Sequence, residues 1–455
     1  MRRNRGNLTE GPMLSGIISY AIPVILTGIL QLLFNAADLI VVGRYRGSIA
    51  LAAVSATGAI TNLIVNLFIG LSVGAGVCVA HGLGGQQDED VHRTVHTAIP
   101  TAFLGGIVLT VIGVVFSEDF LIWMKTPVDV LPYSALYMRY YFCGMTFMLL
   151  YNFAASILRA AGDTRTPLLF LSIAGVVNVG LNLLFVIKLG MHVEGVALAT
   201  VVSQGVSAIL TLIALMCRKD ACRLRIKKIR IYGKQLGKIV RIGLPAGIQG
   251  SLFSISNVFI QTSFNSFNNP ALMSGNGAAG NIEGFIYVAM NSFHQTAINY
   301  IGQNYGARKF DRVRKAYFIC LACVTVVGLA TGLLACAFAE PLLGIYITDS
   351  KDAIQFGLTR FMYVCTTYFI CGIMDVSTGA LRGLGSSFVP MLITVLGVCG
   401  FRILWIYTIF RVPRFHTVES LYLSYPVSWA ITVGVQILAF VILLRKKSRQ
   451  TALAE

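Results

Sequence analysis

The stretch "LRAAGDTRTP", residues 158–167, returns as "LRGLGSSFVP", residues 381–390, so that both copies fit the pattern LRxxGxxxxP at an offset of 223. Two further pairs of segments share nearly the same offset. "YAIPVILTG" and "IGLPAGIQG" place Pro23 and Pro245 222 residues apart, and "HGLGGQQDEDV" and "QNYGARKFDRV" are again 222 apart. Self-similarity at one period along a chain indicates an internal duplication. The sequence therefore predicts two similar halves.

The composition indicates that both halves lie in lipid. Of 455 residues 56% are apolar and only 12% are charged, and the mean hydropathy of +0.75 is far above that of a soluble domain. A helix needs roughly 20 apolar residues to cross about 30 Å of hydrocarbon. The chain offers twelve such runs, which predict an all-α polytopic membrane protein, and the first run is too long for a cleaved signal peptide. We expect spans at 13–42, 49–80, 94–116, 132–157, 167–188, 193–216, 239–263, 279–303, 315–338, 357–380, 388–411 and 421–444.

The basic residues gather on one side of these spans. With the N-terminus inside, 26 of the 36 Lys and Arg fall in cytoplasmic segments, eight fall in outer segments, among them Arg360, and Arg139 and Arg402 fall inside spans. The positive-inside rule then places both termini in the cytoplasm and the protein in the cell membrane. We therefore predict an N-terminal six-helix lobe (1–216), a basic cytoplasmic linker near anionic lipid headgroups (217–238) and a C-terminal six-helix lobe (239–455).

The net charge of +17 is also typical of nucleic-acid-binding chains. The basic run here has no attached domain and no stacking aromatics, so we expect no nucleic-acid partner. Six spans in each half is an even number, so the halves lie the same way up, related by a pseudo-two-fold axis along the membrane normal. Two lobes with a cleft between them are a transporter architecture, although symmetry alone does not establish transport.

The order and spacing of these features resemble the multidrug and toxic compound extrusion (MATE) transporters, on the NorM/DinF-like bacterial branch. The resemblance rests on the Pro23–Asp38 spacing, the glycine-containing loop after the second span and the duplicated LRxxGxxxxP, and it covers nearly the whole chain. It implies a V-shaped pair of six-helix bundles. It also implies export of amphipathic, often cationic compounds, driven by influx of H⁺ or Na⁺ through alternating access. We expect no cofactor and a monomer.

Asp38 is the candidate coupling residue. It stands in an apolar run that carries no other formal charge between Met13 and Arg44, and a carboxylate that faces lipid is unfavourable by several kcal/mol, so it should face the interior of the first lobe. The alternative is a structural acid near the outer end of its helix. Pro23, in the same helix, removes a backbone donor and is expected to permit a bend there.

Three oxygen-bearing residues are candidate partners of Asp38. Asn178 and Asn182 are one helical turn apart on one face, and Thr200 follows on the next span. The resemblance maps an ion or proton site onto Asp38, Asn178, Asn182 and Thr200, in which Asn182 replaces a second acid. This set is able to hold H⁺ or Na⁺, and the sequence leaves the choice open. The alternative role for the Asn and Thr residues is helix packing.

The second lobe carries the buried charges Glu283, Asp375 and Arg402. An unpaired Arg at that depth is unfavourable, so we predict a contact between Arg402 and one of the two acids. A salt-bridged staple and a role in coupling or substrate binding both remain open for these three residues.

Two other classes of function compete with drug export. A flippase for lipid-linked or polyprenyl-linked substrates shares the architecture but is expected to line its cleft with more cationic residues. An intramembrane enzyme needs a metal or nucleophile constellation, and the sequence has neither that nor the GxxxxGK[ST] pattern of an ATP site. The ten cysteines fall in predicted spans or at the linker and form no disulfide framework. The sequence therefore favours a transporter over an enzyme.

Overall fold

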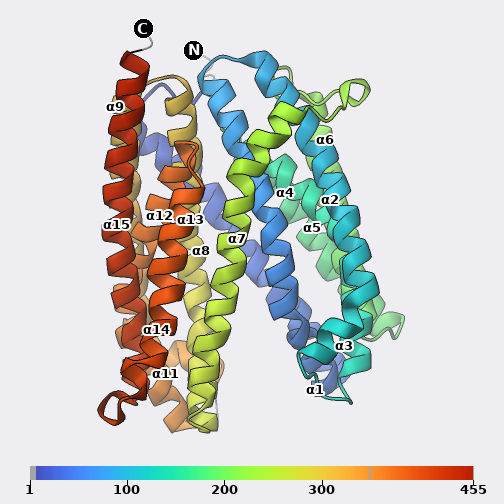
Figure 1. The fold of residues 1–455 in the computed structure, drawn as a ribbon. Coiled ribbons are helices and arrows are strands. Elements are labelled where there is room, and N and C mark those ends of the chain that lie inside the picture. The colour runs from blue at the N-terminus through green and yellow to red at the C-terminus, as the bar shows by residue number, and fades with distance from the viewer. Residues whose placement is uncertain (1–6, 348–349, 454–455) are drawn as a thin grey trace. The chain divides into compact units, whose positions relative to one another are not determined.

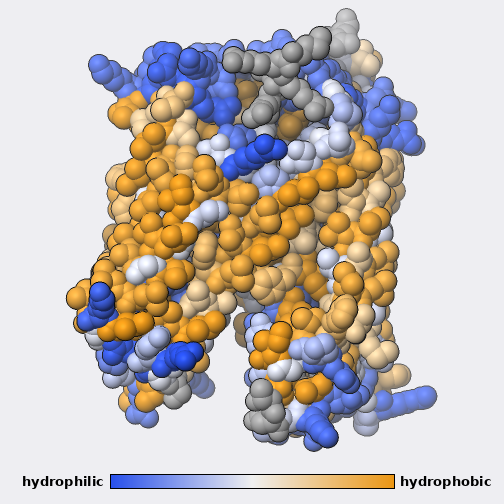
Figure 2. Space-filling view, turned by 180° about the vertical axis from the view of Figure 1, so that it is seen from behind, coloured by the Kyte–Doolittle hydropathy of each residue, from blue (hydrophilic) through white to orange (hydrophobic). Residues whose placement is uncertain are grey.

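The computed structural model describes residues 7–347 and 350–453, and every regular element in them is a helix. The bilayer explains this choice, because a backbone that crosses hydrocarbon must satisfy its own hydrogen bonds, which a helix does within one segment. Figure 1 shows long helices in both halves of the chain, and Figure 2 shows, on the face that it draws, apolar side chains over the middle of the helices and hydrophilic side chains toward their ends. The predicted all-α membrane class is confirmed.

The first half of the chain forms seven helical elements before the linker. They are α1 (Met13–Gly84, broken at Gly47), α2 (Asp88–Trp123), α3 (Leu131–Cys143), α4 (Met145–Ala160), α5 (Arg165–Asn182), the π-helical turn η1 (Leu183–Lys188) and α6 (Val193–Cys217).

The remainder begins with the short turn η2 in the linker. The elements are η2 (Ile226–Lys228), α7 (Gly233–Asn265), α8 (Pro270–Gly306), α9 (Phe310–Ala337), α10 (Ala339–Gly344), α11 (Lys351–Tyr363), η3 (Cys365–Thr367), α12 (Tyr368–Gly383), α13 (Phe388–Thr394), the π-helical turn η4 (Val395–Gly400), α14 (Phe401–Tyr407), η5 (Ile409–Arg411), η6 (Pro413–Phe415) and α15 (Val418–Ala452).

All twelve expected spans fall on these helices. Within the described residues, nine helices are long and apolar enough to cross a membrane, and the bent pair α3 and α4 makes a tenth. The other two spans lie on α7 and α8, which have 33 and 37 residues and are long enough, but they do not pass the same test of apolar composition. Apolar composition alone therefore identifies α7 and α8 least well among the expected spans.

The contacts divide the chain into two compact units that do not follow the sequence order. Unit 1 contains Leu26–Ile248, and unit 2 contains Leu8–Ile25 together with the chain from Gln249 onward. Helices α1 and α7 thus each begin in one unit and end in the other. The lobes 1–216 and 239–455 stay a prediction. The units differ from them in that each includes the opening segment of the other half.

The duplicated LRxxGxxxxP motif has the same backbone geometry in both copies. Gly162 and Gly385 both have φ of +79°, a left-handed conformation that glycine adopts without strain. After each glycine the next amide donates back to the leucine carbonyl that opens the motif, at 2.9 Å in the first copy and 3.1 Å in the second. This is the Schellman arrangement that ends helices, and here it ends α4 and α12. The repeat in the sequence is therefore a repeat in structure.

Four glycines bring α1 and α7 into backbone contact within unit 1. Gly70 and Gly74 face Gly243 and Gly247, two small-xxx-small pairs of the kind that let membrane helices approach closely. A Cβ atom added at Gly70 would lie 2.2 Å from the backbone nitrogen of Gly247, and one added at Gly247 would lie 2.3 Å from the carbonyl oxygen of Leu67. No side chain fits at this crossing unless the helices separate.

We expect Gly247→Ala to lower the stability of the protein by about 1–3 kcal/mol, because the added methyl group overpacks the crossing. Gly237→Ala, in the same helix, is the matched control, since nothing lies within 4 Å of a Cβ at that position. Thermal unfolding of the two purified variants measures the difference. Equal melting temperatures would contradict the close crossing.

Candidate functional site

Asp38 lies in the part of α1 that belongs to unit 1, and only 8% of its surface is exposed. Its carboxylate accepts two hydrogen bonds from other helices. The Asn182 amide donates to Oδ1 at 2.5 Å, and the Thr200 hydroxyl donates to Oδ2 at 3.2 Å. The carboxylate therefore faces α5 and α6 in the interior of the unit. This is the side expected from the high free energy of a charged side chain exposed to lipid.

Asn178 completes the group. It accepts a hydrogen bond from Asn182 at 3.2 Å and donates one to the Thr200 hydroxyl at 3.4 Å. Both asparagines are buried, at 4% and 1% exposure. The structure thus brings together the four residues that the sequence predicted to meet, Asp38, Asn178, Asn182 and Thr200. Their role in ion coupling stays a prediction.

The packing of an aromatic ring sets the register of these helices. Phe34 of α1 lies against Gly175 of α5, where a Cβ atom would come within 2.3 Å of three carbons of the ring. One turn further along α1 is Asp38, and the corresponding face of α5 carries the two asparagines. The α-helical hydrogen bonding ends at Asn182, where the π-helical turn η1 begins. Single π-helical turns are frequent at functional sites.

The site is acidic and has no counter-charge among the described residues, because no Lys or Arg forms an ion pair with Asp38. The Oδ1 atom of Asn182 is buried and has no hydrogen-bond partner in the same part of the chain. The available ligands are one carboxylate, two amide oxygens and a hydroxyl, which are the hard oxygen donors that suit a small cation or a proton. No group of three or more His, Cys, Asp or Glu that could hold a metal ion occurs in the described chain.

Two tyrosines near this site were not predicted from the sequence. Tyr137 and Tyr141 of α3 stack with their ring centroids 5.8 Å apart, and both lie near enough to Asp38 to interact electrostatically with its carboxylate. No spacing signal links α3 to α1. Only the packing of unit 1 identifies these residues.

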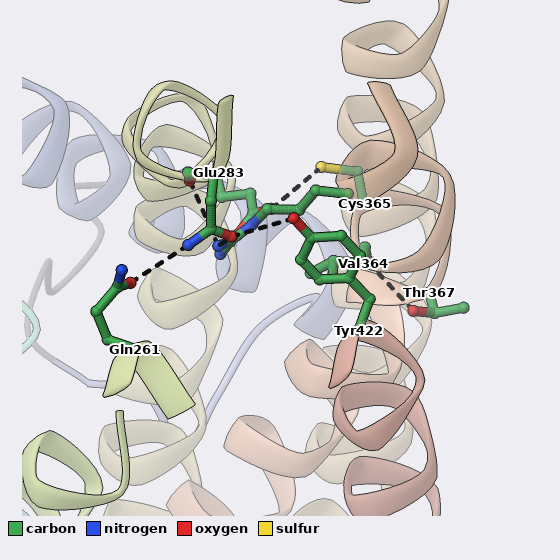
Figure 3. A network of polar contacts seen from close by, with 8 residues as sticks. Gln261, Glu283, Val364, Cys365, Thr367 and Tyr422 are labelled. Carbon is green, nitrogen blue, oxygen red and sulfur yellow. Dashed lines mark hydrogen bonds and ion pairs between the residues drawn. The ribbon is translucent and has the colours of Figure 1, made fainter. Parts of the chain in front are cut away.

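The second unit holds a different polar centre, shown in Figure 3. Glu283 of α8 forms a bidentate ion pair with Arg360 of α11, with Nε to Oε1 at 2.7 Å and Nη2 to Oε2 at 2.6 Å. Arg360 also donates to Oδ1 of Asn276, which accepts a second hydrogen bond from Tyr422 at 3.3 Å. The charge of Glu283 is therefore neutralised by a well-oriented partner.

The predicted contact between Arg402 and an acid is wrong. Arg402 donates from Nε to the Ser428 hydroxyl at 3.1 Å, and its guanidinium lies over the Tyr425 ring at 4.1 Å and the Trp429 ring at 5.7 Å. The physical reason is that Glu283 already forms an ion pair with Arg360, which the sequence analysis assigned to an outer segment. Aromatic faces stabilise the buried Arg402 cation instead.

Asp375 of α12 belongs to a third polar group, also in unit 2. Its Oδ2 atom is buried and has no hydrogen-bond partner in the described chain, while its backbone carbonyl is 2.6 Å from Nδ1 of His294. The other ring nitrogen of His294 is 3.3 Å from Arg382, which donates to Gln249 at 2.8 Å. Asp375 and Arg382 interact electrostatically, but no ion pair between them is found among the described residues. Asp375 is therefore not neutralised as Glu283 is.

Comparison with known proteins decides the family. The family model described as MatE matches residues 23–184 and 245–408, one match in each half of the duplication. The chain belongs to the MatE family.

Several relatives match the chain over most of its length. It is 25% identical over 424 residues to the probable multidrug resistance protein YoeA of Bacillus subtilis, covering 91% of this chain and 90% of the relative. It is 23% identical to the FAD transporter of Shewanella oneidensis, covering 87% of each chain.

Solved structures confirm the fold. A structure described as the outward-facing conformation of a multidrug resistance MATE family transporter aligns with a TM-score of 0.89 at 19% identity, covering 97% of this chain and 98% of that chain. The resemblance inferred from the sequence motifs is thus confirmed, as are the two-lobed fold class and the identity of the protein as a membrane transporter rather than an enzyme.

Removing one partner of the Glu283–Arg360 pair should destabilise the MatE transporter strongly. Glu283→Gln leaves a buried guanidinium without its counter-charge, and we expect a loss of about 3–5 kcal/mol. The double variant Glu283→Gln/Arg360→Met should recover most of it, because both charges are then absent. Thermal unfolding of the purified protein measures the change.

The exposed pair between Glu118 and Arg139 is the control. Its side chains are 54% and 46% exposed, so Glu118→Gln should change stability by less than about 1 kcal/mol. A similar small effect for Glu283→Gln would show that the buried pair is not a structural contact.

Proposed function

We propose that this transporter exports amphipathic, often cationic drugs or toxic organic compounds in exchange for inward movement of H⁺ or Na⁺, through alternating access. The observation that carries the proposal is the buried carboxylate of Asp38 among three neutral side chains. An ionised carboxylate in such a place is unstable without a cation or a proton. Asp38 is therefore suited to take up and release the coupling ion, and Asn178, Asn182 and Thr200 supply the remaining oxygen ligands.

The second-unit charges have different roles in this proposal. Glu283 is neutralised by Arg360 and acts as a staple between α8 and α11. Among the described residues, the buried Oδ2 atom of Asp375 has no hydrogen-bond partner and its carboxylate forms no ion pair, so it is the second candidate for coupling. Arg402, stacked on aromatic rings, is a candidate for contact with substrate or for packing.

We also infer that the protein lies in the cell membrane with both termini and the linker in the cytoplasm. The support is the distribution of Lys and Arg, since the basic linker and the basic last turn of α15 both fall on the side that the positive-inside rule assigns to the cytoplasm.

A second substrate class has specific support. The side chains of Arg382 and Arg402 are buried in unit 2, and each has one nitrogen without a hydrogen-bond partner in the described chain. The relative named FAD transporter is a precedent for an anionic substrate. Efflux assays should therefore compare a lipophilic fluorescent cation with a flavin nucleotide. Movement of a lipid-linked sugar across the membrane of vesicles that contain the purified protein would favour the flippase alternative.

Asp38→Asn should abolish gradient-driven export, because an amide cannot exchange a proton or bind a cation as a carboxylate does, and only a differential interaction with two states can drive transport. The folded protein should persist, since the amide has the same volume, still accepts from Asn182 and can donate to Thr200, whose hydroxyl already has a second acceptor in Val196. Accumulation of a lipophilic fluorescent cation in cells at matched expression measures export.

The control for this variant is Glu118→Gln, an exposed acid whose loss should leave export unchanged. Asn182→Asp, which restores a second acid to the site, should increase the dependence of transport on Na⁺. Full gradient-driven efflux by Asp38→Asn would mean that the acid is structural, and Asp375 would become the coupling candidate.

Pro23→Ala should weaken export more than folding. Pro23 lies just before the point at which α1 passes from unit 2 to unit 1, between Ile25 and Leu26, so a bend there changes how the two parts of the helix are connected. Pro100→Ala, within α2 of unit 1, is the control. Unchanged efflux by Pro23→Ala at matched expression would support a static kink.

A further inference from the structure

The linker between α6 and α7 is fixed to unit 1 rather than free in solution. The Leu224 amide donates to the Leu215 carbonyl at 3.1 Å, which brings the linker back along the last turn of α6. The Arg225 amide donates to Nε2 of His96 at 3.0 Å, and the Tyr232 amide donates to the Thr97 hydroxyl at 3.1 Å. These bonds attach both ends of the stretch 225–232 to α2.

The points of attachment fix the depth of the linker. His96 and Thr97 are eight and nine residues beyond the start of α2 at Asp88, and a helix rises about 1.5 Å per residue, so the linker lies roughly 12 Å along this transmembrane helix from its end. Burial raises the pKa of the Cys222 thiol to about 12, so this residue stays protonated and serves as packing beneath the linker. His96 and Thr97 also lie at the start of the span expected at 94–116, so the segment is held near the level where this helix is expected to leave the hydrocarbon.

Between its attachments the linker exposes an unusual set of side chains. All seven residues of "RIKKIRI", 225–231, are exposed, and Ile226, Ile229 and Ile231 are 67%, 40% and 41% exposed. The other four are Arg225, Lys227, Lys228 and Arg230, and none of them forms an ion pair in the described chain. Three of the nearby acids are paired with other basic residues: Asp220 with Arg218, Asp90 with Lys238 and Glu89 with Arg93.

We propose that residues 225–231 form a docking surface for anionic phospholipid headgroups. The headgroups belong to the leaflet next to the end of α6 and the start of α7. The basic side chains would bind headgroup phosphates, and the three isoleucines would enter the boundary between headgroups and acyl chains. A nucleic acid would neutralise the basic residues but leave the isoleucines in water. Only an anionic membrane surface satisfies both kinds of side chain at this depth. On the proposed orientation this leaflet is the cytoplasmic one, and no other part of the proposal depends on that orientation.

Protection from trypsin in bilayers of defined composition tests the docking. The full-length protein is placed in nanodiscs of phosphatidylcholine alone or of phosphatidylcholine and phosphatidylglycerol in equal parts, and the rate of cleavage within 225–231 is followed by mass spectrometry. We expect phosphatidylglycerol to slow cleavage by roughly fivefold for each basic side chain that binds a headgroup, and high salt to reverse this. Equal rates in the two bilayers would overturn the proposal, as would protection by inorganic phosphate or duplex DNA in the phosphatidylcholine discs.

The variant Ile226→Ser/Ile229→Ser/Ile231→Ser keeps every trypsin site and separates membrane docking from simple charge attraction. We expect it to lose most of the protection in phosphatidylglycerol. Protection equal to that of the unchanged protein would overturn the insertion of the isoleucines.

A matched pair of charge variants tests the location. Lys227, Lys228 and Arg230 are changed together to Gln, and Arg445, Lys446 and Arg449 at the end of α15 are changed in the same way. Native mass spectrometry then counts the phosphatidylglycerol molecules retained by each protein. We expect only the linker variant to lose bound lipid, and equal losses would overturn the proposal. Neither readout involves transport, so an inactive transporter would leave both results interpretable.

Discussion

The carboxylate of Asp38, buried with no cation beside it in the described chain, is the constraint on which the first unit depends. Only 8% of the Asp38 surface is exposed, so the carboxylate must take most of its polar contacts from the protein. Asn182 and Thr200 provide those contacts from two different helices, and Asn178 links them. Burying the acid therefore fixes the relative positions of α1, α5 and α6, and the same arrangement creates oxygen ligands for an ion.

The duplication repeats the scaffold but not this site. The two LRxxGxxxxP motifs share φ of +79° at their glycines, and both end a helix in the same way. At the same offset of 222, however, Ile260 stands where Asp38 stands in the first half. At 223, Phe401, Trp405 and Leu423 stand where Asn178, Asn182 and Thr200 stand. The second half instead has the Glu283–Arg360 pair and the group around Asp375. The two halves thus end a helix in the same way at this motif, while the positions that form the Asp38 site in the first half carry apolar residues in the second.

Sequence reasoning succeeded where one rule governs one segment. Apolar length predicts the helices, and the high cost of a charge in lipid predicts that Asp38 faces inward. Its partners Asn178, Asn182 and Thr200 were predicted from their oxygen-bearing side chains and from the family resemblance. Sequence reasoning failed for Arg402. The rule that a buried cation needs an acid does not say which of two cations will lie beside a given acid in the fold. Arg360 lies on α11 with a side chain only 11% exposed, and its place beside Glu283 depends on the packing of α8 against α11. Tyr137 and Tyr141 were missed for the same reason, since their proximity to Asp38 is a property of the fold and not of any spacing.

The division of α1 between the two units connects the site to the rest of the transporter. Residues Leu8–Ile25 pack within unit 2, and Asp38 lies twelve residues beyond Leu26 along the same helix, in unit 1. On the proposed mechanism, uptake of H⁺ or Na⁺ changes the hydrogen bonds that hold this helix against α5 and α6. Any resulting shift of the helix reaches unit 2 through the continuous backbone around Pro23, where the missing amide hydrogen makes bending easier. An ion site does not then need to touch the substrate to influence it, because the helix that carries the acid is itself a part of both units.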